Sequence, residues 1–225
     1  MFVYLFLTIF LLSSPKNYAQ ELDDEDCMYM ALEGECDENP DMMLDECGPS
    51  ICKEWKDEFG GVDLDKIDSF YDLSAKDIDG NVVDFDEFRG KIVLIANVAS
   101  YCGHTEQHYK ELVELHSDLA GMAVEILAFP CNQFGAQEPD APAKIKAFAK
   151  SKGAQFRMME KIDVNGRDSH LVYKWMKSFA GPFKIEWNFD TYFIIDLDGD
   201  VEEYSGVTPS ELKEEILMLL DQEEL

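Results

Sequence analysis

Cys102 is the residue of this chain whose position most favours chemistry. It follows an apolar run, Lys91–Val98, that is short, rich in β-branched residues and bounded by glycines, as a buried parallel strand should be. After Gly103 apolar residues recur at helical spacing, at Leu112, Leu115, Leu119 and Met122. The thiol therefore lies at or just before the first turn of a helix, where free N–H groups and the helix dipole stabilise a nucleophilic thiolate. The alternative is a small cysteine buried in the sheet core.

Three short segments share a specific combination of residues with one known family. They read NVASYCGHT at residues 97–105, FPCNQFGAQEP at residues 129–139 and WNF at residues 187–189. Together, and in this order, they resemble the glutathione peroxidase family, and the resemblance extends from about Ser69 to Leu220. Members of that family are similar to thioredoxin in fold. The resemblance therefore implies an α/β, thioredoxin-like fold with a central mixed sheet flanked by helices.

The same resemblance implies a peroxidase, an oxidoreductase that acts on hydrogen peroxide or lipid hydroperoxides. Cys102 would attack the peroxide oxygen, and three further residues would complete the catalytic site: Gln137, Trp187 and Asn188. These three side chains are uncharged hydrogen-bond donors, so they can polarise a peroxide without protonating the thiolate permanently. Taken singly, Trp187 would be a packing residue and Gln137 a solvated loop residue. Their joint occurrence favours catalysis.

The oxidised cysteine must be reduced again, and the sequence leaves its reductant open. Many cysteine-type relatives use a resolving cysteine in the helix after Gln-Glu-Pro, but Ala141–Lys152 contains none. Cys131 is an alternative, because a right-handed β-α-β crossover brings both strand ends to one sheet edge; otherwise it is a passive part of its segment. Glutathione or protein disulfide isomerase-like thiols would then be the reducing co-substrate, with no other cofactor and no metal. No basic cluster suited to glutathione stands out, which weakly disfavours a dedicated glutathione site.

Two histidines, His104 and His108, follow Cys102 closely. They either stabilise the thiolate or face solvent. We favour solvent, because both fall on what reads as a surface helix.

The composition fits one catalytic domain with an appendage and excludes some partners. Of 225 residues, 46% are hydrophobic and 12% aromatic, which suffices for one full core. The formal net charge of -28 excludes nucleic acid and disfavours acidic lipid surfaces, because no basic patch exists to neutralise phosphates. The short link between Lys177 and Trp187 resembles family members without an oligomerisation loop, so we expect a monomer.

The N-terminal region combines many acidic residues with a high density of cysteine. Composition alone would predict a disordered acidic tail, yet four of the six cysteines lie here: Cys27, Cys36, Cys47 and Cys52. Their spacing lacks the Cys-x-x-Cys pairs of common zinc sites, which favours disulfides. The segment resembles the ShK-toxin-like (ShKT) module, although that module's first and last cysteines are missing. The resemblance implies bridges between Cys27 and Cys47 and between Cys36 and Cys52; spacing alone leaves three connectivities open.

The two ends of the chain suggest where it works. Residues 1–19 have the apolar run and small-residue cut site of a signal peptide, and the run is too short to span a membrane comfortably. The last four residues, 222–225, read QEEL and resemble an endoplasmic-reticulum retrieval signal. The segments TEQHY at 105–109 and QEPD at 137–140 are closest to the endoplasmic-reticulum members of the family. We therefore expect the lumen of that compartment, with secretion as the alternative.

The sequence predicts the following organisation. A signal peptide (1–19) precedes the acidic ShKT-like module (20–55), a linker (56–68), the thioredoxin-fold domain (69–221) and the possible retrieval signal (222–225). Within the domain we expect strands at 91–98 and 124–129, hairpins formed by 70–74 with 82–85 and by 192–196 with 201–204, and helices at 141–152, 169–179 and 209–220.

Two other classes of protein compete with this hypothesis. The first alternative is a non-catalytic redox sensor or binding protein that uses the ShKT-like module, although such a protein would be expected to lose catalytic residues. The second alternative is a thiol-disulfide oxidoreductase. This class usually needs Cys-x-x-Cys, and here Thr105 stands where the second cysteine of that motif would be.

Overall fold

The chain folds into two compact units, Met1–Cys52 and Lys53–Leu225, which are described separately. The computed structural model describes residues 27, 30–31, 35–60, 62, 64–180 and 184–221. The expected signal peptide at residues 1–19 and the retrieval signal at residues 222–225 lie outside this part. None of the helices in the described part is both long and apolar enough to cross a bilayer.

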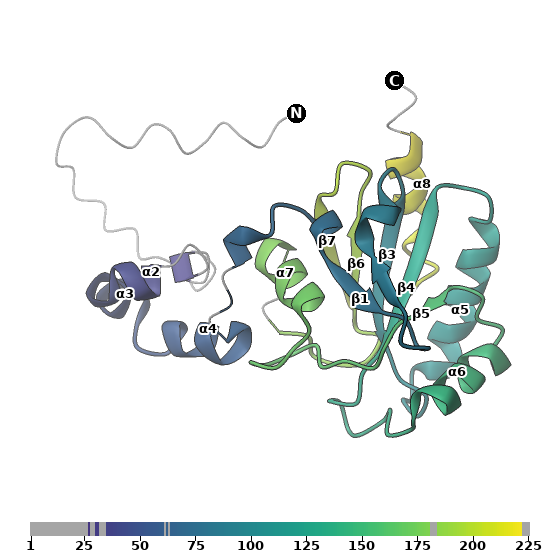
Figure 1. Cartoon of the computed structure of the whole chain (residues 1–225), viewed down its shortest axis with the longest axis horizontal. Coiled ribbons are helices and arrows are strands. Elements are labelled where there is room, and N and C mark those ends of the chain that lie inside the picture. The colour runs from purple at the N-terminus through teal and green to yellow at the C-terminus, as the bar shows by residue number, and fades with distance from the viewer. Residues whose placement is uncertain are drawn as a thin grey trace. The chain divides into compact units, whose positions relative to one another are not determined.

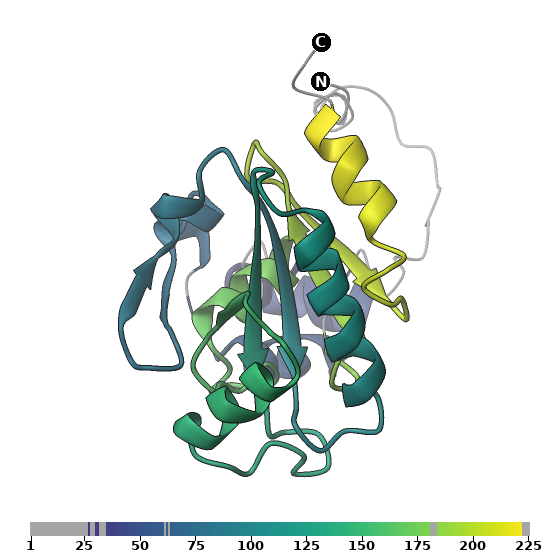
Figure 2. The same cartoon turned by 90° about the vertical axis from the view of Figure 1, so that its right-hand side faces the viewer.

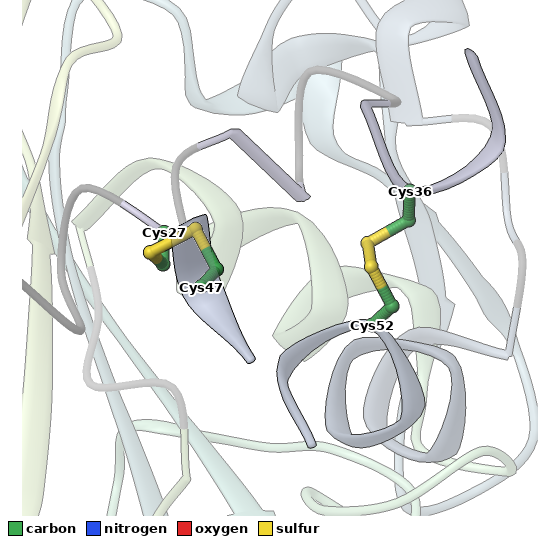
Figure 3. Close-up of a disulfide and its surroundings, with 4 residues drawn as sticks. All are labelled: Cys27, Cys36, Cys47 and Cys52. Carbon is green, nitrogen blue, oxygen red and sulfur yellow. A yellow bond between two sulfur atoms is a disulfide. The ribbon is translucent and has the colours of Figure 1, made fainter. Parts of the chain in front are cut away.

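Disulfides take the place of a large apolar core in the N-terminal unit. They join Cys27 to Cys47 and Cys36 to Cys52, the pairing that the ShKT resemblance implies (Figure 3). Cys36 lies in helix α2 (Glu35–Glu38), and Cys47 is the last residue of helix α3 (Pro40–Cys47). Each bridge restricts the unfolded chain and contributes about 2–4 kcal/mol in proteins generally.

Helix α4 spans Ile51–Phe59, and its residues from Lys53 onward belong to the C-terminal unit. Phe59 is fully buried, and the Glu58 carboxylate forms a buried ion pair with Lys177 of α7 (Leu171–Ala180). The Lys177 ammonium also donates to the carbonyl of Val164. The segment expected as a linker thus contains residues that pack like core residues.

A five-stranded mixed sheet forms the centre of the C-terminal unit, in the order β5-β4-β3-β6-β7. The parallel strands are β3 (Ile92–Val98), β4 (Val124–Pro130) and β5 (Arg157–Met158). Strands β6 (Thr191–Ile195) and β7 (Val201–Ser205) continue the sheet in antiparallel fashion. Every residue of β3 is buried, as its apolar sequence, interrupted only by Asn97, predicts for a central strand. The expected mixed sheet with flanking helices is confirmed.

Helices cover both faces of this sheet and create two core clusters. Helix α7 lies on one side and α5 (Thr105–Asp118) and α6 (Pro142–Ser151) on the other (Figure 1). Helix α8 (Lys213–Asp221) shares the second core cluster with α5 through Ile216, and Leu212, just before the helix, belongs to the same cluster. The hairpin of β1 (Ser74–Lys76) and β2 (Val82–Asp84) lies on the side of the strands away from α5 and α8 (Figure 2).

Several expected elements begin or end elsewhere than the sequence suggested. Residues 70–72 form a 3₁₀ turn rather than a strand, because the Asp72 carboxylate accepts the Ser69 N–H at 3.0 Å and closes the turn. Helix α8 begins at Lys213, not Pro209. In the preceding turn, the Glu211 carboxylate accepts the Thr208 N–H at 2.7 Å, and Glu111 of α5 accepts the Ser210 N–H at 3.2 Å. These side-chain contacts hold a tight turn where a continuous helix was predicted.

Candidate active site

Cys102 lies in the loop between β3 and α5, residues 99–104, which we call the Cys102 loop. Helix α5 begins three residues later at Thr105, whose hydroxyl donates to the carbonyl of Ala99 at 2.6 Å and whose N–H donates to that of Cys102 at 3.2 Å. These bonds fold the loop back on itself. The cysteine therefore sits just before the first turn of the helix, and 7% of its surface is exposed.

Gln137 lies in the loop between β4 and α6, residues 131–141, which we call the Gln137 loop. Its backbone carbonyl accepts the N–H of Tyr101 at 3.0 Å, which joins this loop to the Cys102 loop one residue from the sulfur. Gly135 and Ala136 precede Gln137 with φ angles of 60° and 53°. A left-handed alanine is strained by about 1 kcal/mol or more, so packing around the loop holds this bend.

Trp187 and Asn188 lie just before β6, and Asn97 of β3 holds them in place. The Asn97 amide donates to the Trp187 carbonyl at 3.2 Å and to the Asn188 side-chain oxygen at 3.4 Å. The backbone carbonyl of Asn97 accepts the N–H of Phe189 at 3.0 Å, and Phe189 has a φ of 63°. The sequence analysis did not single out Asn97, although a polar side chain inside a fully buried strand was a usable signal.

Two of the four expected catalytic residues, Gln137 and Asn188, are linked to the Cys102 loop by successive hydrogen bonds. The Asn188 amide donates to the Gln137 side-chain oxygen at 3.3 Å. The NH₂ group of Gln137 takes no part in this bond and can donate to another group. Asn188 is buried, whereas the Trp187 side chain is 40% exposed and its ring lies 5.8 Å from that of Phe134 between centroids. Buried packing therefore does not account for Trp187, and an indole at the surface can donate to a ligand.

Cys131 occupies a different environment from Cys102. Both follow strands that end at the same sheet edge, as expected, and the Cys131 N–H donates to the Val98 carbonyl at 2.9 Å. The Cys131 side chain, however, belongs to the core cluster on the α7 face, whereas Cys102 belongs to the cluster on the α5 face. Cys131 is fully buried, and this burial raises the pKa of its thiol to about 11.

The two histidines of this region differ, and the expectation that both face solvent is wrong for His108. His104 is exposed. His108 is buried against the ring of Phe189, with centroids 5.3 Å apart, and its Nδ1 lies 2.6 Å from the Tyr192 hydroxyl. Burial, and secondarily the charge of His104, lowers the pKa of His108. The first turn of α5 is more deeply buried than its polar residues indicated, since Thr105 and His108 are both buried.

Glu138, next to Gln137, is a buried acidic residue that the sequence analysis did not single out. Its side chain is fully buried, and one carboxyl oxygen accepts the Ser100 hydroxyl at 3.0 Å. Its N–H donates to the Asn132 side chain at 2.8 Å, and its carbonyl accepts the Lys161 ammonium at 3.1 Å. Burial raises the pKa of the Glu138 carboxyl. A Glu inside a glycine- and proline-containing loop gave no signal of burial.

Comparisons with known proteins find similarity in both sequence and fold. The family model described as glutathione peroxidase matches residues 70–177. The phospholipid hydroperoxide glutathione peroxidase of Sus scrofa is 47% identical over 144 residues, which cover 61% of this chain and 72% of that protein. The crystal structure of Trgpx in its apo form has a TM-score of 0.58 and 33% identity, covering 69% of this chain and 97% of that one.

A more distant structure shows the fold alone. The thiol:disulfide interchange protein of the thioredoxin family from Chlorobium tepidum has a TM-score of 0.50 and 16% identity, covering 66% of this chain and 92% of that chain. The fold of the C-terminal unit is thioredoxin-like.

Proposed function

Because this chain belongs to the glutathione peroxidase family and is a peroxidase, we propose that Cys102 is the thiol that reduces hydrogen peroxide or organic hydroperoxides. The observation that carries this proposal is the hydrogen-bonded link from the Cys102 loop through Gln137 to Asn188. This link joins the loop that contains the thiol to the segments that contain two neutral amide donors. The relative named for phospholipid hydroperoxide supports the organic peroxides as substrates.

The proposed first step forms a sulfenic acid. The Cys102 thiolate attacks one peroxide oxygen, the O–O bond breaks, and the departing oxygen takes a proton to leave as water or an alcohol. Negative charge grows on the departing oxygen, and donors fixed in advance stabilise it without reorganisation. We assign this role to the Gln137 and Asn188 amides and the Trp187 indole, none of which carries a charge that would hold the thiolate protonated.

The proposed second half of the cycle uses two external thiol groups. One thiol condenses with the sulfenic acid to give a mixed disulfide and water, and a second thiol releases Cys102 and leaves as half of a new disulfide. An internal route through Cys131 is disfavoured, because its thiol is fully buried on the α7 face and protonated at neutral pH.

Glutathione or a protein disulfide isomerase-like dithiol would supply the reducing equivalents. Two observations support the lumen of the endoplasmic reticulum as the place of work. The N-terminal unit contains two disulfides, which persist in oxidising compartments. Residues 1–19 and 222–225 also have the composition of a signal peptide and a retrieval signal. Secretion is the alternative.

Peroxide consumption tests this proposal directly. The purified mature chain is supplied with hydrogen peroxide and with either glutathione or reduced protein disulfide isomerase, and the loss of peroxide is followed. We expect consumption with at least one reductant and a loss of at least about a hundredfold in Cys102→Ser, because an alcohol is far less acidic than a thiol. Consumption that survives in Cys102→Ser would place the chemistry elsewhere. A preference for the isomerase over glutathione would favour the endoplasmic-reticulum assignment.

A further inference from the structure

Three hydrogen bonds join the Cys102 loop to the Gln137 loop. The hydroxyl of the exposed Tyr101 side chain donates to the Asp140 carboxylate at 2.6 Å. The other two bonds lie at adjacent points. The backbone bond from Tyr101 to Gln137 is one of them. The other is the bond from the Ser100 hydroxyl to the Glu138 carboxyl, at 3.0 Å. Ser100 precedes Tyr101 in the sequence, and Glu138 follows Gln137. The two bonds together form a clasp that leaves the loops little freedom to move apart.

The Glu138 carboxyl is poorly satisfied as an anion. Its Oε2 accepts from Ser100, but its Oε1 is buried without a hydrogen-bond partner in the described part of the chain. The hydroxyl of Tyr109, on α5, is likewise buried and unpartnered. An isolated buried carboxylate is costly, whereas a protonated carboxyl can both accept from a hydroxyl and donate to one.

The charged groups around Glu138 do not remove this cost. Lys161 lies nearby and donates to the backbone carbonyl of Glu138, not to its carboxyl oxygens. Burial is the largest effect on the Glu138 carboxyl and raises its pKa. The hydrogen bonds from Ser100 and the charge of Lys161 lower this pKa, and the like charge of Asp140 raises it, but the raising effects prevail. Burial is the main cause that raises the pKa of Tyr109, and the charge of Glu138 is the second, so the two side chains interact electrostatically.

We propose that Glu138 is a positioning residue that acts as a neutral carboxyl, clasping the Cys102 loop to the Gln137 loop through Ser100. It touches no substrate in this account. Its effect is to fix the separation between the Cys102 sulfur and the Gln137 amide, and small errors in such a separation cost large factors in rate. This inference rests on the proposed function of Cys102.

The test compares side chains that keep or break the clasp. In the reduced full chain, stopped-flow fluorescence gives the rate constant for oxidation of Cys102 by hydrogen peroxide. Glu138→Ala and Ser100→Ala each break the clasp, and we expect each to slow oxidation by about tenfold or more. Because both remove the same bond, the double variant should be no more than about twofold slower than the slower single variant. Glu138→Gln mimics the neutral carboxyl, so it should remain within about threefold of the parent, with the same pH profile between about pH 6 and pH 8.

Controls separate positioning from folding and from the chemistry itself. Glu114→Ala, which removes an exposed glutamate from the middle of α5, should leave the rate unchanged. Melting temperatures identify variants that do not fold. If Glu138→Ala does not fold, Ser100→Ala alone tests the loss of the clasp. A folded Glu138→Ala or Ser100→Ala with the parent rate would overturn the clasp. A Glu138→Gln as slow as Glu138→Ala would overturn the neutral carboxyl. A parent chain in which Cys102 does not react would instead defeat the proposed function.

Discussion

At the scale of single residues, the two free cysteines of the chain lie in different core clusters, on opposite faces of the sheet. Cys102 lies just before the start of α5 and keeps 7% of its surface exposed, whereas Cys131 is fully buried. Thiol reactivity depends on access and on the thiolate fraction. The two cysteines should therefore behave differently toward the same oxidant.

Replacing Cys131 tests this contrast. Because its thiol is buried with a pKa of about 11, Cys131→Ala should leave peroxide consumption within about twofold of the parent. It should also lower the free energy of unfolding by about 1–2 kcal/mol, since a buried sulfur is lost from the core. Steady-state peroxide assays and urea unfolding measure the two effects. A severe loss of activity in a folded Cys131→Ala, with a Cys102–Cys131 bridge in the oxidised parent, would establish Cys131 as the resolving thiol.

The sequence could identify candidate chemical groups but not what supports them. Cys102, Gln137, Trp187 and Asn188 were chosen by resemblance of three segments. The structure links Gln137 to the Cys102 loop, Asn188 to Gln137, and Trp187 to Asn97 of β3 by hydrogen bonds. Asn97 and Glu138 were missed because their importance lies in contacts between segments tens of residues apart. Local sequence carries no direct signal of such contacts.

At the scale of elements, helix α5 is fixed to the sheet by a buried polar contact as well as by apolar packing. His108 meets the Tyr192 hydroxyl of β6, and its ring also packs on Phe189, which follows Asn188. The same contact thus supports the helix that begins beside Cys102 and the segment that contains two proposed catalytic residues.

The buried histidine should make the protein sensitive to acid. Burial lowers the pKa of His108, and also that of His170, in the folded protein. Below about pH 6.5 the unfolded chain then binds more protons than the folded one, so stability falls as pH falls, by up to about 1.4 kcal/mol per pH unit for each histidine.

A variant separates this effect from the many carboxylates of the chain. His108→Gln keeps a hydrogen-bonding group for Tyr192 but cannot titrate, so it should lose less stability than the parent between pH 7 and pH 5.5. Urea unfolding at both pH values gives the comparison. Equal losses in the parent and in His108→Gln would show that His108 protonates as readily in the folded state as in the unfolded chain. His104 and Glu111, which influence His108 most among charged groups, are retained in both proteins.

The elements themselves were largely predictable, and the failures have physical causes. Strands β3, β4, β6 and β7 follow from apolar or alternating runs, and the turn at Asp79-Gly80-Asn81 joins β1 to β2 as expected. Strand β5 was missed because two residues carry no periodic signal. The predicted start of α8 and the predicted strand at residues 70–72 were wrong, because side-chain caps and not apolar periodicity determine the structure at both places.

At the scale of the whole molecule, charge should influence the choice of reductant. The formal net charge of -28 repels anions at long range, and glutathione carries a net negative charge. Added salt screens such repulsion, since the Debye length falls from about 30 Å at 0.01 M to about 8 Å at 0.15 M salt.

Salt dependence therefore probes how glutathione approaches. We expect the reduction of peroxide-treated enzyme by glutathione to accelerate several-fold over this range of salt. Reduction by neutral 2-mercaptoethanol, the matched control, should stay nearly constant. Single-turnover kinetics with each thiol give both rates. A glutathione reaction that slows with salt would indicate a local basic site for this tripeptide and would weaken the case for a protein dithiol.

The central claim is that Cys102 is the residue that peroxide oxidises. The most direct test mixes the reduced chain, with its two N-terminal disulfides intact, with one equivalent of hydrogen peroxide in a stopped-flow instrument. The product is then trapped with a sulfenic-acid reagent and mapped by mass spectrometry. This account predicts one fast phase and label on Cys102, with Cys131 still a free thiol. Label on Cys131 instead, or no oxidation of Cys102 on the time scale of peroxide loss, would contradict it.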